Sequence, residues 1–132
     1  VCVIDLDTTM NGSAVYDFGD MVRTATSPVG EDEVDTSKIS MRMNMFEALV
    51  KGYLSSANAF LTDKERELLP FAGKLLTIEC GTRFLADYLM GDVYFKIHKD
   101  GHNLDRTRSQ MALADSIDSQ MAEMEAVVAK YS

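Results

Sequence analysis

The 132-residue sequence is poor in cysteine and in basic residues, and it lacks any long apolar run. The two cysteines are too few for a disulfide framework, so we expect a reducing, cytoplasmic environment. With 13 basic against 21 acidic residues the net charge is −8, which disfavours nucleic acid and anionic membranes as partners. Without a run of about 18 apolar residues, no membrane-spanning helix is predicted.

Several catalytic motifs are also missing. The sequence contains neither G-x-x-x-x-G-K-[ST] nor G-x-G-x-x-G, so the common glycine-rich phosphate loops are excluded. It contains no G-x-S-x-G, and no spacing suggests a Cys–His nucleophile pair.

What is present is an ordinary globular composition, with 46% apolar and 26% charged residues, which predicts a single domain over 1–132. Residues 1–6 form an apolar run that predicts a buried strand. Because a buried strand needs neighbours on both sides, we expect the chain to be a fragment of a longer protein.

The remainder predicts a mainly α fold with a short strand or hairpin at its front. Asn11-Gly12 indicates a turn, and Ser37 is a candidate helix cap. We expect helices over 14–25, from Ser37 to about 56, from Thr62 to about 90 and over about 105–130, separated by an exposed acidic loop (26–36) and an aromatic-rich connection (91–104).

The third predicted helix is the best defined. Thr62 and Glu65 have the spacing of a capping box, and Gly91 is a typical stop. Its apolar residues lie on most sides, which predicts a central position. In the last helix Ala114, Met121 and Val128 repeat every seven residues, a packing seam either within the molecule or between two copies.

Carboxylates are the main candidate site residues. Asp5 and Asp7 follow the predicted strand and share a face, an arrangement that suits a hard divalent ion such as Mg²⁺. Asp17 begins the next helix, where Arg23 is within reach of Asp20, so a structural network at the helix start is favoured there.

A polar stripe crosses the long apolar helix. Glu79, Arg83 and Asp87 lie at i, i+4 and i+8. Charges in such a place must be paired or face a cleft, so a salt-bridge ladder and contact with a ligand both remain open.

Five segments resemble the aminoglycoside phosphotransferase/choline kinase family, and most closely its N-acetylhexosamine 1-kinase branch. The resemblance covers essentially the whole chain, but only about the last third of such a kinase. It is carried by residues 3–8 (Val-Ile-Asp-Leu-Asp-Thr), 16–24, 79–89, 91–95 and 98–108.

The resemblance implies the helical C-terminal portion of a protein-kinase-like (APH-type) C-lobe. Asp5 would hold Mg²⁺ against the phosphates of ATP, with Asp7 supporting the metal or the substrate end. Asp17 would buttress the catalytic loop. Arg83 and Tyr94 would contact the sugar, whose anomeric hydroxyl receives the γ-phosphoryl group of ATP; GlcNAc and GalNAc are not distinguished.

The family's catalytic loop, His-x-Asp-x-x-x-x-Asn, and its nucleotide-binding lobe are expected upstream of Val1. No catalytic residue is therefore assigned within 1–132, and we expect the fragment to be inactive alone. Apolar surface exposed on the long helix would then favour a homodimer.

Two alternatives stay open. Asp5 and Asp7, with Thr9, also fit the D-x-D-x-T motif of haloacid-dehalogenase-type phosphatases, with Asp5 as nucleophile. The heptad seam and the acidic surface instead suit a non-enzymatic helical interaction module.

Overall fold

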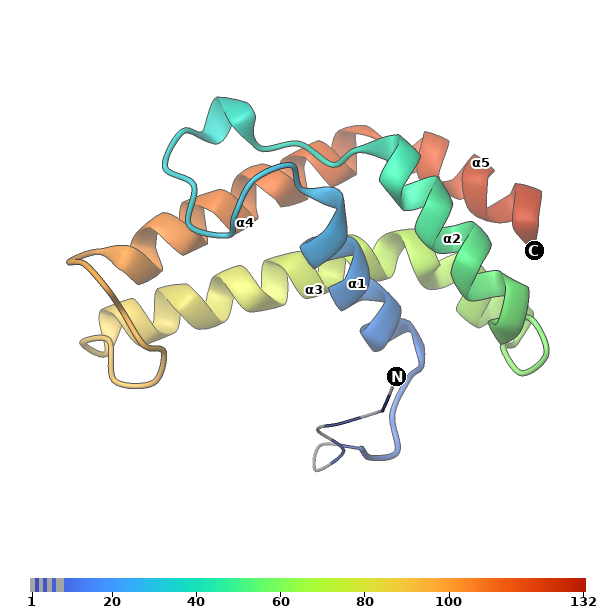
Figure 1. Cartoon of the computed structure of the whole chain (residues 1–132), viewed down its shortest axis with the longest axis horizontal. Coiled ribbons are helices and arrows are strands. Elements are labelled where there is room, and N and C mark those ends of the chain that lie inside the picture. Colours follow the sequence, from blue (N-terminus) through green and yellow to red (C-terminus); the bar gives the residue numbers. More distant parts are fainter. Residues whose placement is uncertain (1, 3, 5, 7–8) are drawn as a thin grey trace.

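A long central helix, α3 (Asp63–Leu89), organises the molecule. It packs chiefly against α1 (Val15–Thr26), α4 (His102–Ser119) and α5 (Met121–Tyr131), while α2 (Met43–Ala57) bridges α1 and α5 (Figure 1).

The computed structural model describes residues 2, 4, 6 and 9–132, and in this part of the chain every regular element is a helix. The prediction of a mainly α fold is confirmed. Positions 1, 3 and 5 of the predicted strand lie outside the described residues, as do Asp7 and Thr8.

The local signals for α3 are confirmed. The hydroxyl of Thr62 accepts the Glu65 N–H at 3.3 Å, and the Glu65 carboxylate accepts the Thr62 N–H at 2.9 Å, which completes the capping box. The helix continues through Pro70 and ends where Gly91 adopts a positive φ of 92°.

The start of α2 was predicted too early. Ser37 lies inside a short 3₁₀ turn, η1 (Thr36–Lys38), because the carboxylate of Asp35 accepts both its N–H and its hydroxyl. Extended backbone follows, and α2 begins only at Met43. The guanidinium of Arg42 binds the carbonyl oxygens of Ala25, Thr26 and Ser27. These bonds attach the extended segment before α2 to the end of α1.

The predicted last helix is two helices. Gln120 interrupts it, and the side-chain amide of Gln120 donates to the carbonyl oxygens of Met41 at 3.0 Å and Ser116 at 3.1 Å. The tertiary bond to Met41 offsets the loss of regular helix at this position. Across the break the heptad seam packs inward, with Ala114, Ile117, Met124 and Val128 all buried, so it is a seam within the molecule.

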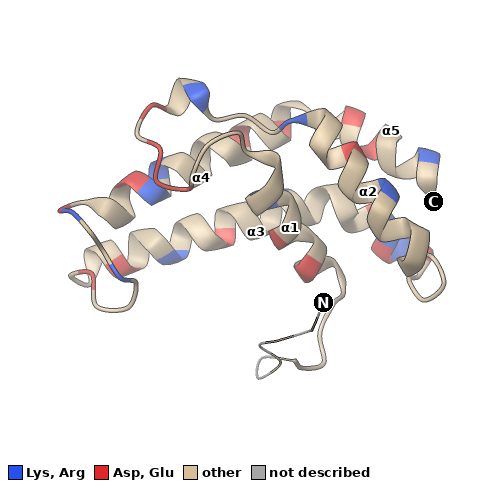
Figure 2. Cartoon of the chain, in the orientation of Figure 1, with Lys and Arg blue, Asp and Glu red and all other residues tan. Residues whose placement is uncertain are grey.

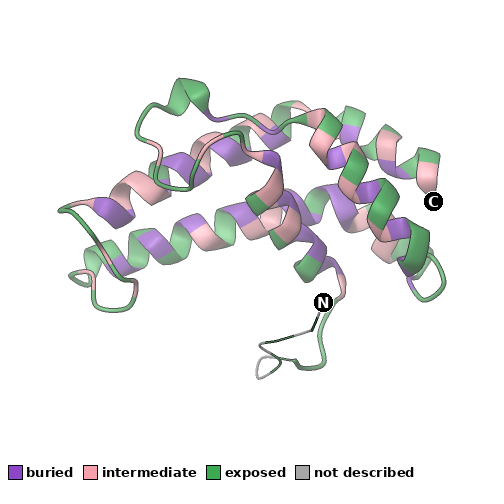
Figure 3. Ribbon diagram, viewed as in Figure 1, coloured by how far each residue is buried: buried purple, intermediate pink, exposed green. Residues whose placement is uncertain are grey.

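The core fills the space between α1, α2 and the later helices (Figure 3). Phe18 and Phe46 are fully buried and meet edge to face with ring centroids 6.2 Å apart. Two glycines allow close helix contacts. A Cβ on Gly19 would lie 2.4 Å from the carbonyl oxygen of Ala72, and one on Gly81 would lie 2.4 Å from Cε of Met111.

One face of α3 remains outside this core. Four of its large apolar side chains are exposed by 37–74%, and they recur at intervals of seven, seven and four residues. This α3 stripe consists of Phe71, Ile78, Leu85 and Leu89.

Candidate functional site

The C-terminal end of α3 turns sharply into the 91–101 connection. The N–H of Asp92 donates to the carbonyl oxygen of Asp87 at 2.8 Å, and that of Gly91 donates to the carbonyl oxygen of Tyr88 at 3.1 Å. This pair of bonds is a Schellman motif. Asp92 takes a positive φ of 57°, which directs the chain back along the helix.

The carboxylate of Asp87 receives the next three backbone amides. Its Oδ1 accepts the N–H groups of Val93 at 3.0 Å and Tyr94 at 2.8 Å, and its Oδ2 accepts that of Phe95 at 2.9 Å. Burial of this carboxyl, which is 2% exposed, raises its pKa, but these N–H groups and the amide of Asn103 outweigh burial and leave the pKa of Asp87 below its ordinary value. Asp87 is therefore held as a carboxylate.

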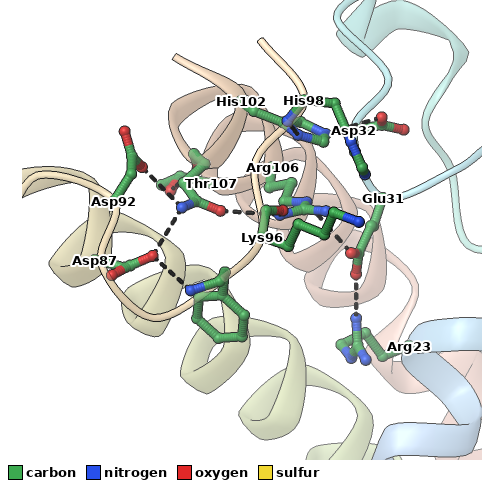
Figure 4. A network of polar contacts seen from close by, with 12 residues as sticks. Arg23, Glu31, Asp32, Asp87, Asp92, Lys96, His98, His102, Arg106 and Thr107 are labelled. Atoms are coloured by element: carbon green, nitrogen blue, oxygen red, sulfur yellow. Dashed lines mark hydrogen bonds and ion pairs between the residues drawn. The ribbon is translucent and has the colours of Figure 1, made fainter. Parts of the chain in front are cut away.

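Asn103 extends the network from Asp87 into α4. Figure 4 shows Asp87, Asp92 and Arg106 in this network. The side-chain NH₂ of Asn103 donates to Asp87 Oδ2 at 2.9 Å and to Asp92 Oδ1 at 2.8 Å, and its oxygen accepts from Arg106 at 3.0 Å. Arg106 also donates to the carbonyl oxygen of Lys96 at 3.3 Å and lies over the Phe84 ring. The 91–101 connection is thus attached to the first turns of α4 at Asp92 and at Lys96.

Arg83 and Tyr94, the two residues that the resemblance assigns to a sugar, lie close together beside this network. The guanidinium carbon of Arg83 lies 5.9 Å from the ring centroid of Tyr94 and 5.5 Å from that of Phe95. Arg83 also forms an ion pair with Glu79 at 3.7 Å. The predicted polar stripe is therefore divided: Glu79 and Arg83 pair in solvent, whereas Asp87 is buried and faces the connection.

A groove of about 660 Å³ opens between α1, α3 and the connection. Its lining combines aromatic rings with charges of both signs, which distinguishes it from a purely apolar cavity. It includes Tyr16, Asp17, Asp20, Arg23, Glu79, Arg83, Phe95 and Arg106, whereas Tyr94 lines an adjoining hollow that shares Arg83 and Phe95.

Of the network predicted for the start of α1, the pairing of Arg23 with Asp20 is confirmed, but Arg23 lies in the last turn of the helix. Arg23 donates through Nε to Asp20 at 2.9 Å, and its Nη1 reaches Glu31 of the acidic loop at 3.4 Å. Glu31 lies 3.4 Å from Nε of Arg106 as well, so one carboxylate joins α1 to α4. Asp17 is exposed at the mouth of the groove.

The acidic loop also reaches His102, the first residue of α4. The His98 N–H donates to Nδ1 of His102 at 3.2 Å, which assigns the ring proton to Nε2, 3.1 Å from Asp32 Oδ2. The hydrogen bond from His102 lowers the pKa of Asp32. Sequence reasoning treated this loop as solvated and assigned no role to Asp32 or Asn103. Only the position of Asp87, a carboxylate on an apolar helix, signalled that it needed partners.

Asp5 and Asp7, the predicted metal ligands, lie outside the described residues. Among the residues that the structure describes, no three His, Cys, Asp or Glu side chains gather closely enough to hold a metal ion. Charges of both signs are spread over the surface (Figure 2), and no helix in the described part is long and apolar enough to cross a membrane. No known protein-family model matches the chain.

Proposed function

We propose that this chain is the sugar-recognition part of a cytoplasmic, ATP-dependent phosphotransferase that acts on the anomeric hydroxyl of an N-acetylhexosamine. The observation that supports the proposal is the placement of Arg83 against Tyr94 and Phe95 at the edge of a polar groove. The sequence resemblance assigned Arg83 and Tyr94 to the sugar. Their closeness is an independent property of the fold, because they stand 11 positions apart in the chain.

The chemistry of the groove suits a sugar. Aromatic rings such as those of Tyr94 and Phe95 offer apolar faces to the C–H side of a pyranose. The guanidinium of Arg83 donates to hydroxyl and acetamido oxygens, and the half-exposed carboxylate of Glu79 accepts from hydroxyl groups. A mixed set of this kind orients a polar ligand more than it buries one.

In the proposed reaction, the described residues bind and orient the acceptor. Mg²⁺·ATP would supply the phosphoryl group, and the resemblance assigns the metal to Asp5 and Asp7. The described residues contain no metal cluster of their own, so we derive no step through the ion. The catalytic loop and the nucleotide-binding lobe would come from outside these 132 residues. Positioning of the acceptor hydroxyl is the contribution that Arg83 and Tyr94 make.

Binding tests this proposal directly. The ¹⁵N-labelled chain is titrated with GlcNAc, GalNAc and glucose, and backbone and Arg side-chain shifts are followed by NMR. We expect saturable shifts at Arg83, Tyr94 and Phe95 with a Kd on the order of 1 mM for an N-acetylhexosamine. Arg83→Ala is expected to weaken binding about tenfold, because it removes a charged hydrogen-bond donor.

The matched control is Arg108→Ala, since this arginine is exposed on α4 and pairs only loosely with Asp105 at 3.6 Å. Binding that is equally weak in both variants, or absent in the unmodified chain, would overturn the sugar proposal. Hydrolysis of p-nitrophenyl phosphate in the presence of Mg²⁺ would instead favour the phosphatase alternative.

The α3 stripe supports a second candidate function, an interaction surface. We propose that a second copy of the chain covers it, because four exposed apolar side chains recur along one face of the helix. Light scattering after size-exclusion chromatography is expected to show a dimer, and Leu85→Glu is expected to shift it toward monomer. Val34→Glu, which changes an exposed apolar residue of the acidic loop outside the α3 stripe, is the control. A monomer at all concentrations would rule out the homodimer.

A further inference from the structure

Four consecutive backbone N–H groups donate hydrogen bonds to a single residue. The N–H groups of 92, 93, 94 and 95 donate to Asp87, the first to its carbonyl oxygen and the other three to its carboxylate. We infer that Asp87 is the positioning residue of the candidate sugar site: it sets the conformation of 92–95 and thereby the placement of Tyr94 and Phe95 beside Arg83. This inference rests on the proposed function where it concerns sugar affinity, but not where it concerns the conformation of the segment.

The acceptor capacity of Asp87 indicates that it acts through the backbone and not through contact with a ligand. A carboxylate offers about four acceptor positions. Here Oδ1 accepts two N–H groups, while Oδ2 accepts the N–H of Phe95 and the amide of Asn103. With the side chain 2% exposed, its acceptor positions are already used within the protein.

Helix stability does not account for an aspartate at this position. The residue lies in the last turn of α3, where the negative end of the helix dipole disfavours a carboxylate. The four N–H donors of the connection and of α4 offset that cost. The arrangement therefore orders the connection, and the helix itself gains little from it.

The position of Asp87 also determines what the ordered segment faces. Arg83 lies one turn earlier on the same rigid helix, so fixing 93–95 to Asp87 fixes the aromatic rings relative to the guanidinium. Tyr94 illustrates the effect: its N–H is bound to Asp87 while its side chain is 70% exposed. Few side-chain contacts hold the phenol in place, so its position depends on its backbone.

The first arm of the test needs no sugar. In the full chain, Asp87→Asn keeps the shape of the side chain but replaces one acceptor oxygen with an NH₂ donor that faces the Phe95 N–H. Hydrogen exchange of the Val93, Tyr94 and Phe95 amides is expected to accelerate about tenfold or more, as the loss of one buried bond predicts. Amides in the middle of α3 serve as the internal reference. Unchanged exchange at 93–95 would overturn the inference.

The second arm measures coupling in sugar affinity. Asp87→Asn and Tyr94→Phe are each expected to weaken N-acetylhexosamine binding about fivefold to tenfold, and the double variant by much less than the product. Asp115 is an exposed aspartate on α4. When Asp115→Asn replaces Asp87→Asn in the cycle, the factors by which the two substitutions change affinity are expected to multiply. Independent effects of Asp87 and Tyr94 on affinity would contradict a positioning role. A general loss of stability in Asp87→Asn would weaken binding by the same factor whether position 94 holds Tyr or Phe.

The two proposals fail in different ways. If the unmodified chain binds no sugar but exchange at 93–95 responds to Asp87→Asn, the sugar function is wrong and the conformational role of Asp87 stands. If Asp87→Asn does not fold, Asn103→Ala takes its place. It removes one of the four donors to the Asp87 carboxylate and leaves the three backbone N–H groups with their acceptor, although it also removes the bonds of Asn103 to Asp92 and Arg106. A smaller acceleration at the same three amides is then expected, and none would overturn the inference.

Discussion

Oδ1 of Asp87 accepts the backbone N–H of Tyr94 at 2.8 Å, so a buried carboxylate on a helix fixes the backbone of an exposed aromatic residue seven positions later. The same carboxylate also binds the amides of Val93 and Phe95. The part of the 91–101 connection that Asp87 binds is therefore the part that lies beside Arg83.

This relationship predicts a pH dependence. The pKa of Asp87 is lower in the folded chain than in the unfolded chain, so its stabilising contribution is complete above the unfolded value of about 3.9 and disappears as the pH falls through the lower folded value. Backbone amide shifts of Tyr94 and Phe95 are expected to be constant from neutral pH down to about 4 and to move only below it. NMR from pH 7 to acid checks this, and a midpoint above the unfolded value of about 3.9 would contradict it.

A glycine contact between α1 and α3 predicts a stability effect. In Gly19→Ala the new methyl group would meet the carbonyl oxygen of Ala72 at 2.4 Å, so the helices must separate, and we expect a loss of about 1–3 kcal/mol in the free energy of unfolding. Gly52→Ala is the control, because nothing lies within 4 Å of that position in α2 and alanine favours helix by about 0.5–1 kcal/mol. Urea unfolding measures both, and equal effects would argue against the close contact.

The capping box of α3 gives a third prediction. Thr62→Ala removes the oxygen that accepts the Glu65 N–H and is expected to cost about 1 kcal/mol of stability. Thr82→Ala, in the middle of the same helix and exposed, is expected to change stability by less than about 0.5 kcal/mol. Thermal unfolding followed by circular dichroism compares the two, and a neutral Thr62→Ala would show that the first turn is held by other contacts.

Two phenylalanines test the placement of the core. Phe46 is completely buried, and Phe46→Ala is expected to destabilise the chain by about 3–5 kcal/mol through lost burial and the cavity left behind. Phe60 follows α2 and is 67% exposed, so Phe60→Ala is expected to change stability by less than about 0.5 kcal/mol. Chemical denaturation distinguishes them. Similar losses in the two variants would mean that the core does not lie between α1 and α2.

Interactions between near neighbours were predictable. The capping box at Thr62, the stop at Gly91, whose N–H binds Tyr88, and the pairing of Arg23 with Asp20 all join residues three positions apart, and all are present. Boundaries that depend on distant partners were not. The interruption at Gln120 reflects its bond to Met41, and just before the late start of α2 the guanidinium of Arg42 binds carbonyl oxygens at the end of α1.

The candidate site shows the same division. The resemblance assigned Arg83 and Tyr94 to a sugar, which stays a prediction, and the sequence marked Asp87 as a charge in need of partners. The partners of Asp87 depend on the tertiary structure. The chain reverses at Gly91, and α4 then places Asn103 beside the Asp87 carboxylate.

The sequence by itself determined the helical class and the approximate extents of α1 and α3, because apolar spacing and end signals act over three or four residues. The tertiary structure alone decided that the polar stripe would divide, with Glu79 and Arg83 in solvent and Asp87 under the connection. A buried carboxylate needs hydrogen-bond donors within about 3 Å. Here those donors come from other segments of the chain, and local sequence patterns do not predict where those segments lie in the fold.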